Sequence, residues 1–116
     1  MTITIEELKE KLSNCYSKEL CYPKIADEWN EKNKSFGMCA ITSLIVNDIF
    51  GGEICKIYVG DISHYFNMID GRIVDLTAGQ FNFDIDYRGY KIVDRNSILN
   101  DESIERYNIL KQRLGE

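Results

Sequence analysis

The sequence predicts a single α+β domain over residues 1–116, with N-terminal helices packed on a small antiparallel sheet. Three observations support this fold class: a helix-capping pattern near the N-terminus, a long apolar run closed by two glycines, and an Asp-Gly pair between two strand-like runs. A length of 116 residues with 44% hydrophobic and 28% charged residues is typical of one globular domain with one core.

The first helix is expected over residues 5–14. Thr4 followed by Glu7 matches a capping box, and Ile5, Leu8 and Leu12 then fall on one helical stripe. Residues 17–34 contain the one proline and a polar run, so we expect short helices and loops there.

A second, buried helix is expected to begin at Cys39. The run CAITSLIVNDIF is apolar on most sides, and Gly51-Gly52 follows it as a glycine C-terminal cap. Gly37 lies just before the helix.

The strands are expected after that helix. The β-branched run EICKIYVG predicts one strand, and HYFNMI and RIVDLT predict a hairpin around Asp70-Gly71, because a type I′ turn needs positive φ at both central residues. Residues 78–90 are expected to form irregular structure or a further strand, and residues 90–94 an edge strand.

A closing helix is expected over DESIERYNILKQRL. Its acidic start and basic end match the helix dipole, and Ile104, Tyr107 and Leu114 lie near one stripe with Leu110 beside it.

Charge and cysteine content limit the possible partners and location. A net charge of −5 without a basic stripe argues against nucleic acid as a partner. The N-terminus has early acidic residues and no long apolar run, so we expect no signal peptide, no membrane partner and a cytoplasmic location. The four cysteines are then expected to be reduced thiols rather than disulfides.

The hairpin register places a histidine and an aspartate on one face. If Asp70 and Gly71 are the loop residues, Phe66 faces Asp75 and His64 faces Thr77. His64 and Asp75 are then diagonal neighbours with backbones roughly 7–8 Å apart, which an imidazole and a carboxylate can span. A catalytic imidazole needs such a partner to fix its tautomer and to stabilise the imidazolium.

Cys39 is the candidate nucleophile that completes this constellation. At the start of a helix, the dipole, the backbone N–H groups and a neighbouring imidazolium all favour the thiolate. The same N–H groups could bind an oxyanion. A cysteine at a helix start is more often a small core residue, and a lone histidine beside aromatic residues is often structural, so both alternatives stand beside the catalytic one.

Two segments, FGMCAITSLIVNDIFGGEI and HYFNMIDGRIVDLTAGQF, resemble the YunG family of small bacterial proteins. The resemblance covers roughly residues 23–83, and the pattern is similar to papain-like and transglutaminase-like thiol enzymes. It implies a cysteine-protease-like fold, in which a cysteine opens a helix packed on an antiparallel sheet, and a catalytic set of Cys39, His64 and Asp75. Where family members often carry glutamine and tryptophan, this chain has Met38 and Phe66.

Three further residues are candidates for substrate binding. Trp29, Asn67 and Gln80 could line a cleft or donate to an oxyanion, although Trp29 could equally fill the core and Asn67 could cap a strand end. Cys15, Cys21 and Cys55 are expected to be packing residues, because their spacing matches no metal-ligand pair. We therefore expect no metal and no cofactor.

The function expected from these residues is cysteine-dependent acyl transfer on a peptide, protein or small amide. Hydrolysis, deamidation and transglutaminase-like exchange all fit. The alternatives are a catalytically silent interaction module with the same fold and a zinc-stabilised binding domain.

Overall fold

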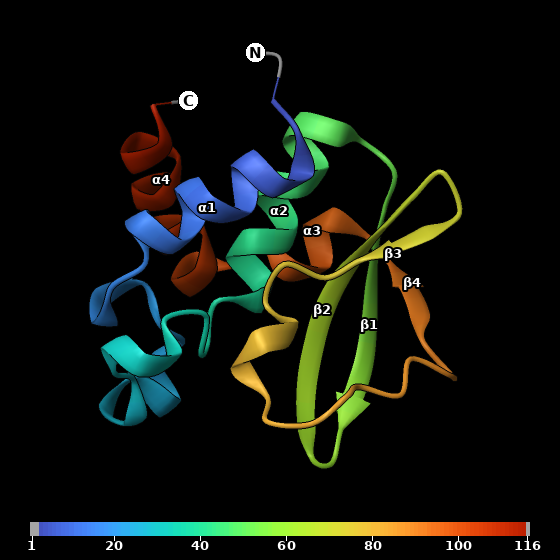
Figure 1. Cartoon of the computed structure of the whole chain (residues 1–116), viewed down its shortest axis with the longest axis horizontal. Helices are drawn as coiled ribbons and strands as arrows, with labels where there is room; N and C mark the ends of the chain where they lie inside the picture. The colour runs from blue at the N-terminus through green and yellow to red at the C-terminus, as the bar shows by residue number, and fades with distance from the viewer. Residues whose placement is uncertain (1–2, 116) are drawn as a thin grey trace.

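A four-stranded antiparallel sheet forms one side of the molecule (Figure 1). The computed structural model describes residues 3–115. The strand order is β3-β2-β1-β4, with β1 at Glu53–Val59, β2 at Ile62–Ile69, β3 at Arg72–Val74 and β4 at Lys91–Val93. The α+β class with helices beside an antiparallel sheet is therefore confirmed.

The helices gather on one face of this sheet (Figure 1). They are α1 at Ile5–Cys15, α2 at Cys39–Phe50, α3 at Arg95–Ile98 and α4 at Asp101–Leu114. Helix α2 contacts β1 and β2 on one side and α4 on the other, so it forms the middle of the core. Short 3-10 helices occupy much of residues 18–33, as expected.

Local sequence signals explain where α1 begins. The Glu7 amide donates to Thr4 Oγ1 and the Thr4 amide donates to Glu7 Oε1, each over 3.1 Å, so the capping box is complete. Leu8 and Leu12 are buried on the face that meets the core.

The two faces of the sheet bury different clusters. The face carrying Ile54 and Tyr65 belongs to the main core with α2. The opposite face carries Cys55, Ile57 and Phe66, against which Tyr87 packs. The segment that contains Tyr87 crosses this second face of the strands (Figure 1).

The predicted hairpin forms with the predicted register. Asp70 and Gly71 have φ values of 51° and 76°, and Asn67 pairs with Val74 while Ile69 pairs with Arg72. The predicted strand to residue 77 is too long, because β3 ends at Val74. Asp75 leaves the ladder because its carboxylate accepts a hydrogen bond from the Thr77 amide and so turns the backbone.

The C-terminal third follows the expected order with one addition. Of the two alternatives for residues 78–90, the irregular one forms, with the 3-10 helix Ala78–Gln80 in it, and the short helix α3, which was not expected, separates β4 from α4. In α4, Tyr107, Leu110 and Leu114 are buried, whereas Ile104 is 45% exposed, so its assignment to the buried stripe was wrong.

Candidate active site

His64 lies in the middle of β2 opposite Ile57 of β1, and its side chain is only 1% exposed. Its Nε2 lies 2.6 Å from Oδ2 of Asp75. A buried imidazole in contact with a carboxylate has its tautomer and ring orientation fixed. The hairpin register therefore brings His64 and Asp75 together as the sequence predicts.

Asp75 is held from all sides just beyond the end of β3. Oδ2 also accepts from the Tyr87 hydroxyl over 2.7 Å, and Oδ1 accepts from the Thr77 amide and hydroxyl over 3.2 and 3.4 Å. A carboxylate with this many donors is held in one orientation.

Cys39 is the first residue of α2 and is half-buried. It lies close enough to the ring of His64 to contribute to the raised pKa of that histidine. Because Nε2 faces Asp75, the nitrogen left for the thiol is Nδ1. This atom is buried and has no hydrogen-bond partner among residues 3–115.

The surroundings of His64 stabilise its charged form. Burial alone would lower the pKa of His64, but the hydrogen bond to Asp75 and the nearby Cys39 outweigh it and raise this pKa from 6.5 to about 9. An imidazolium at neutral pH favours the thiolate of a neighbouring cysteine. By contrast, burial raises the pKa of the thiols of Cys15, Cys21 and Cys55, which makes them poor nucleophiles.

The start of α2 presents backbone donors beside the thiol. Helix α2 has no side-chain N-cap, and its first backbone hydrogen bond runs from the Thr42 amide to the Met38 carbonyl over 3.0 Å. The N–H groups of the first turn therefore remain available to an anion.

Gln80 is hydrogen-bonded to the turn that leads into α2. Its Oε1 accepts from the Gly37 amide over 3.3 Å, and its Nε2 donates to the Thr77 carbonyl over 3.1 Å. Gln80 thus connects the segment after Asp75 to the turn before Cys39. One N–H of its amide is thus used to position this turn, and its role as an oxyanion donor stays a prediction.

Asn67 and Trp29 lie in other surroundings than those expected for substrate contacts. Asn67 is buried on the face of β2 opposite His64, and its Nδ2 donates to the Ser43 carbonyl over 3.0 Å. Its assignment to a substrate cleft is therefore wrong, because this residue fastens β2 to α2. Trp29 packs partly buried against the main core and donates from Nε1 to the Lys34 carbonyl over 3.0 Å, which matches its alternative reading as a core residue.

Sequence reasoning missed Tyr87 and Phe81. Tyr87 donates to Asp75, and the Phe81 ring meets the His64 ring edge-on with centroids 5.1 Å apart. Both belong to residues 78–90, where no helical or strand period predicts which side chains point inward.

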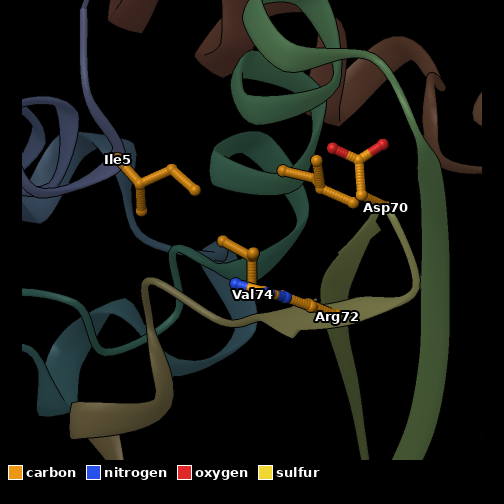
Figure 2. Close-up of a pocket in the computed structure, with 5 residues that line it drawn as sticks. Ile5, Asp70, Arg72 and Val74 are labelled. Atoms are coloured by element: carbon orange, nitrogen blue, oxygen red, sulfur yellow. The ribbon is translucent and has the colours of Figure 1, made fainter.

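The surface has two cavities, and one of them lies next to side chains that contact His64 and Asp75. One, of about 500 Å³, is bounded by residues 78–87 and includes Phe81 and Tyr87, which touch His64 and Asp75. The other, of about 410 Å³, lies between the start of α1 and the β2–β3 hairpin, with Ile5, Asp70, Arg72 and Val74 around it (Figure 2). Cys39, His64 and Asp75 are not among the residues that line this second cavity.

Comparison with known proteins identifies the family. The family model described as YunG protein matches residues 4–116, well beyond the segments that first suggested it. This chain belongs to the YunG family. It is 33% identical over 87 residues to a protein of Bacillus subtilis (strain 168) described as uncharacterized protein YunG, and the match covers 75% of each chain. No solved structure matches the YunG-family chain.

Two further findings concern the whole described chain. No helix within residues 3–115 is long and apolar enough to cross a membrane. No three histidine, cysteine, aspartate or glutamate side chains in the same range gather as metal ligands would.

Proposed function

We propose that this YunG-family protein is a cysteine-dependent acyl-transfer enzyme, with Cys39 as nucleophile, His64 as general base and acid, and Asp75 as the residue that orients His64. The observation that carries the proposal is the His64 ring, which Asp75 holds over 2.6 Å at Nε2, with Cys39 near enough to contribute to the raised pKa of that ring. A nucleophile, a base and an orienting carboxylate in this order are the parts of a catalytic triad.

The two ring nitrogens have separate tasks in this proposal. Nε2–H donates to Asp75, so Nδ1 exchanges the proton with the thiol. In the Ser-His-Asp template the nitrogens have the opposite roles, but the chemical requirement of one oriented and one reacting nitrogen is the same.

The proposed reaction has two steps. The Cys39 thiolate attacks the substrate carbonyl carbon, an S–C bond forms, and the carbonyl π electrons move to oxygen. When the intermediate collapses, the C–N bond breaks and the leaving amine takes the proton from the His64 imidazolium, which leaves a thioester. In the second step, water or an amine attacks the thioester carbon while His64 takes a proton from this nucleophile. The C–S bond then breaks and releases the Cys39 thiolate. Water gives hydrolysis or deamidation, and an amine gives exchange.

The N–H groups at the start of α2 would stabilise the oxyanion. One such donor is commonly worth about 3–4 kcal/mol of barrier. Residue 38 adds no side-chain donor, because the methionine thioether has no N–H or O–H group, and Met38 is fully buried in the main core.

We also propose that the fold belongs with papain-like and transglutaminase-like thiol enzymes. Three features support this: the nucleophile opens a helix, that helix packs on an antiparallel sheet, and His64 and Asp75 come from neighbouring segments of a hairpin. A solved structure of a YunG-family member, compared with both enzyme groups, tests the assignment.

The burial of Met38 gives the alternative function a specific basis. A catalytically silent interaction module needs no polar donor beside the thiol, and the apolar Met38 side chain supplies none. If the protein is such a module, Cys39→Ala should leave its biological effect unchanged. If it is an enzyme, Cys39→Ala should abolish that effect.

Acyl-enzyme formation tests the proposed chemistry directly. With p-nitrophenyl acetate, we expect a burst of nitrophenolate, an acetyl group on Cys39 by mass spectrometry, and its release by hydroxylamine. Cys39→Ala is expected to abolish the burst, while Cys15→Ala, which removes another half-buried thiol, is expected to retain it. A burst that survives Cys39→Ala would refute the assignment.

A further inference from the structure

We propose that the cavity bounded by residues 78–87 binds an apolar side chain of the acyl donor, next to a positively charged group of the same substrate. This inference rests on the proposed function and names the substrate class for the same site: peptides in which an aromatic or large aliphatic residue neighbours a basic one.

The cavity is continuous with the candidate catalytic residues through two side chains. Phe81 lines the cavity and places its ring edge-on to His64, and Tyr87 lines the cavity and donates to Asp75. A group bound there would contact the two side chains that touch the His64–Asp75 pair. Holding a substrate side chain beside catalytic residues helps to position the neighbouring carbonyl for reaction.

The lining favours an apolar occupant. Phe81 and Phe83 lie with ring centroids 5.6 Å apart, and Ile85 and Tyr87 complete the apolar part of the wall. Phe83 is 56% exposed, although burial of a phenylalanine normally stabilises a protein. A substrate side chain that covers Phe83 would remove this apolar surface from water.

The charge at the cavity favours a positively charged group next to the bound apolar side chain. Asp84 is exposed and supplies the one charge among the described residues that line the cavity. The nearby carboxylate of Asp86 is instead engaged by Arg88, with Oδ2 and Nη2 2.7 Å apart. Asp84 and the net charge of −5 of the chain attract a cation and repel an acidic substrate.

Haloacetamides of graded shape test this inference, because each forms an S–C bond with a thiolate and releases iodide. We would compare iodoacetamide with three N-substituted iodoacetamides on the intact protein. The substituents are a phenethyl group, a phenethyl group with a cationic aminomethyl substituent, and a phenethyl group with an anionic carboxylate. The measurement is the alkylation rate of Cys39 by peptide mass spectrometry, divided by that of Cys15, to remove differences in intrinsic reactivity.

We expect the phenethyl reagent to exceed iodoacetamide by about tenfold in this ratio, since one buried aromatic ring supplies that much binding. The cationic reagent should exceed the anionic one. Phe83→Ser should remove the aromatic preference, and Asp84→Asn should remove the preference for the cation.

Two exposed residues outside the cavity provide matched controls. Tyr58 is on the sheet face opposite the one that carries His64, and Asp61 lies in the β1–β2 turn. Tyr58→Ser and Asp61→Asn should keep both preferences.

Equal ratios for all four reagents, or preferences that persist in Phe83→Ser and Asp84→Asn, would overturn the inference. If Cys39 is still alkylated selectively by iodoacetamide in that case, the proposed function stands and only the cavity assignment falls. If Cys39 is no more reactive than Cys15 toward any reagent, the proposed function falls with it.

Discussion

At the residue scale, the candidate site depends on how the oxygens of Asp75 are shared. Oδ1 is held by Thr77, and Oδ2 accepts from both His64 and Tyr87. The carboxylate cannot rotate without losing one of these bonds, so the imidazole that it faces is held in one orientation. The charge of His64 is therefore set by Asp75 as much as by its own burial.

This dependence predicts the titration of His64. By NMR, the imidazole should titrate with a pKa of about 9, and Asp75→Asn should lower this pKa because the neutral amide no longer favours the imidazolium. Thr4→Ala, which removes a distant helix cap, serves as the control and should leave the titration unchanged. A midpoint near the ordinary histidine value in the wild-type protein would contradict the geometry of the pair.

The same residues show how far sequence reasoning reaches. The pairing of His64 with Asp75 follows from the Asp70-Gly71 turn and the two-residue period of strands, both of which are local rules. Tyr87 could not be found in this way, because its approach to Asp75 depends on the path of an irregular segment across the sheet. Asn67 was misplaced because its polar side chain points to the helix face, where it bonds a backbone carbonyl.

At the element scale, the turn before α2 determines where Cys39 sits. Gly37 has a φ of +73°, its carbonyl accepts from the Tyr22 amide over 3.1 Å, and its own amide donates to Gln80. A Cβ at this position would overlap with Sγ of Cys21. The glycine is therefore required both by its backbone conformation and by close packing.

Gly37→Ala is expected to destabilise the protein by about 2–4 kcal/mol, the sum of a positive-φ penalty and an overpacking penalty. Gly60→Ala is the matched control, because Gly60 also has a positive φ of 64° but no atom within 4 Å of its added Cβ. That variant should lose only about 1–2 kcal/mol. Urea unfolding measures both, and equal losses would show that the contact with Cys21 has no energetic role.

The starts of α1, α2 and α4 were predictable at this scale, although no side chain caps α2, whereas the short α3, which Asp94 caps, was not predicted. Thr4 begins α1 and Asn100 begins α4 through complete capping boxes, and the sequence pattern places both helices correctly. The end of β3 was not predictable from strand propensity, because the hydrogen bond from Thr77 to Asp75 outweighs the β-branched character of the run. Ile104 was misassigned because the stripe of α4 that packs inward runs through Tyr107 and Leu110.

At the scale of the whole molecule, a charged pair lies between the sheet and the segment that covers it. The face of the sheet with Cys55, Ile57 and Phe66 is apolar, and His64 shares that face. A charge buried there is tolerated only because Asp75 compensates it, so the site and the stability of the fold are linked.

This link predicts a pH dependence of stability. Because the pKa of His64 is raised from 6.5 to about 9 on folding, its contribution is fully present below about pH 6.5 and is lost as the pH rises through about 9. We expect the free energy of unfolding of the wild-type protein to exceed that of His64→Gln most at the acidic end of this window. Urea titrations of both proteins across the window measure the difference, and a difference that stays constant or grows with pH would contradict the linkage.

The most direct measurement of the central claim is the alkylation rate of each of the four cysteines by iodoacetamide near pH 6, followed by mass spectrometry. If His64 activates Cys39 as its nucleophile, Cys39 should react at least about tenfold faster than Cys15, and His64→Gln should abolish the difference. Cys39 reacting no faster than Cys15 in the wild-type protein, or keeping its advantage in His64→Gln, would show that the two side chains do not act as a nucleophile and its base.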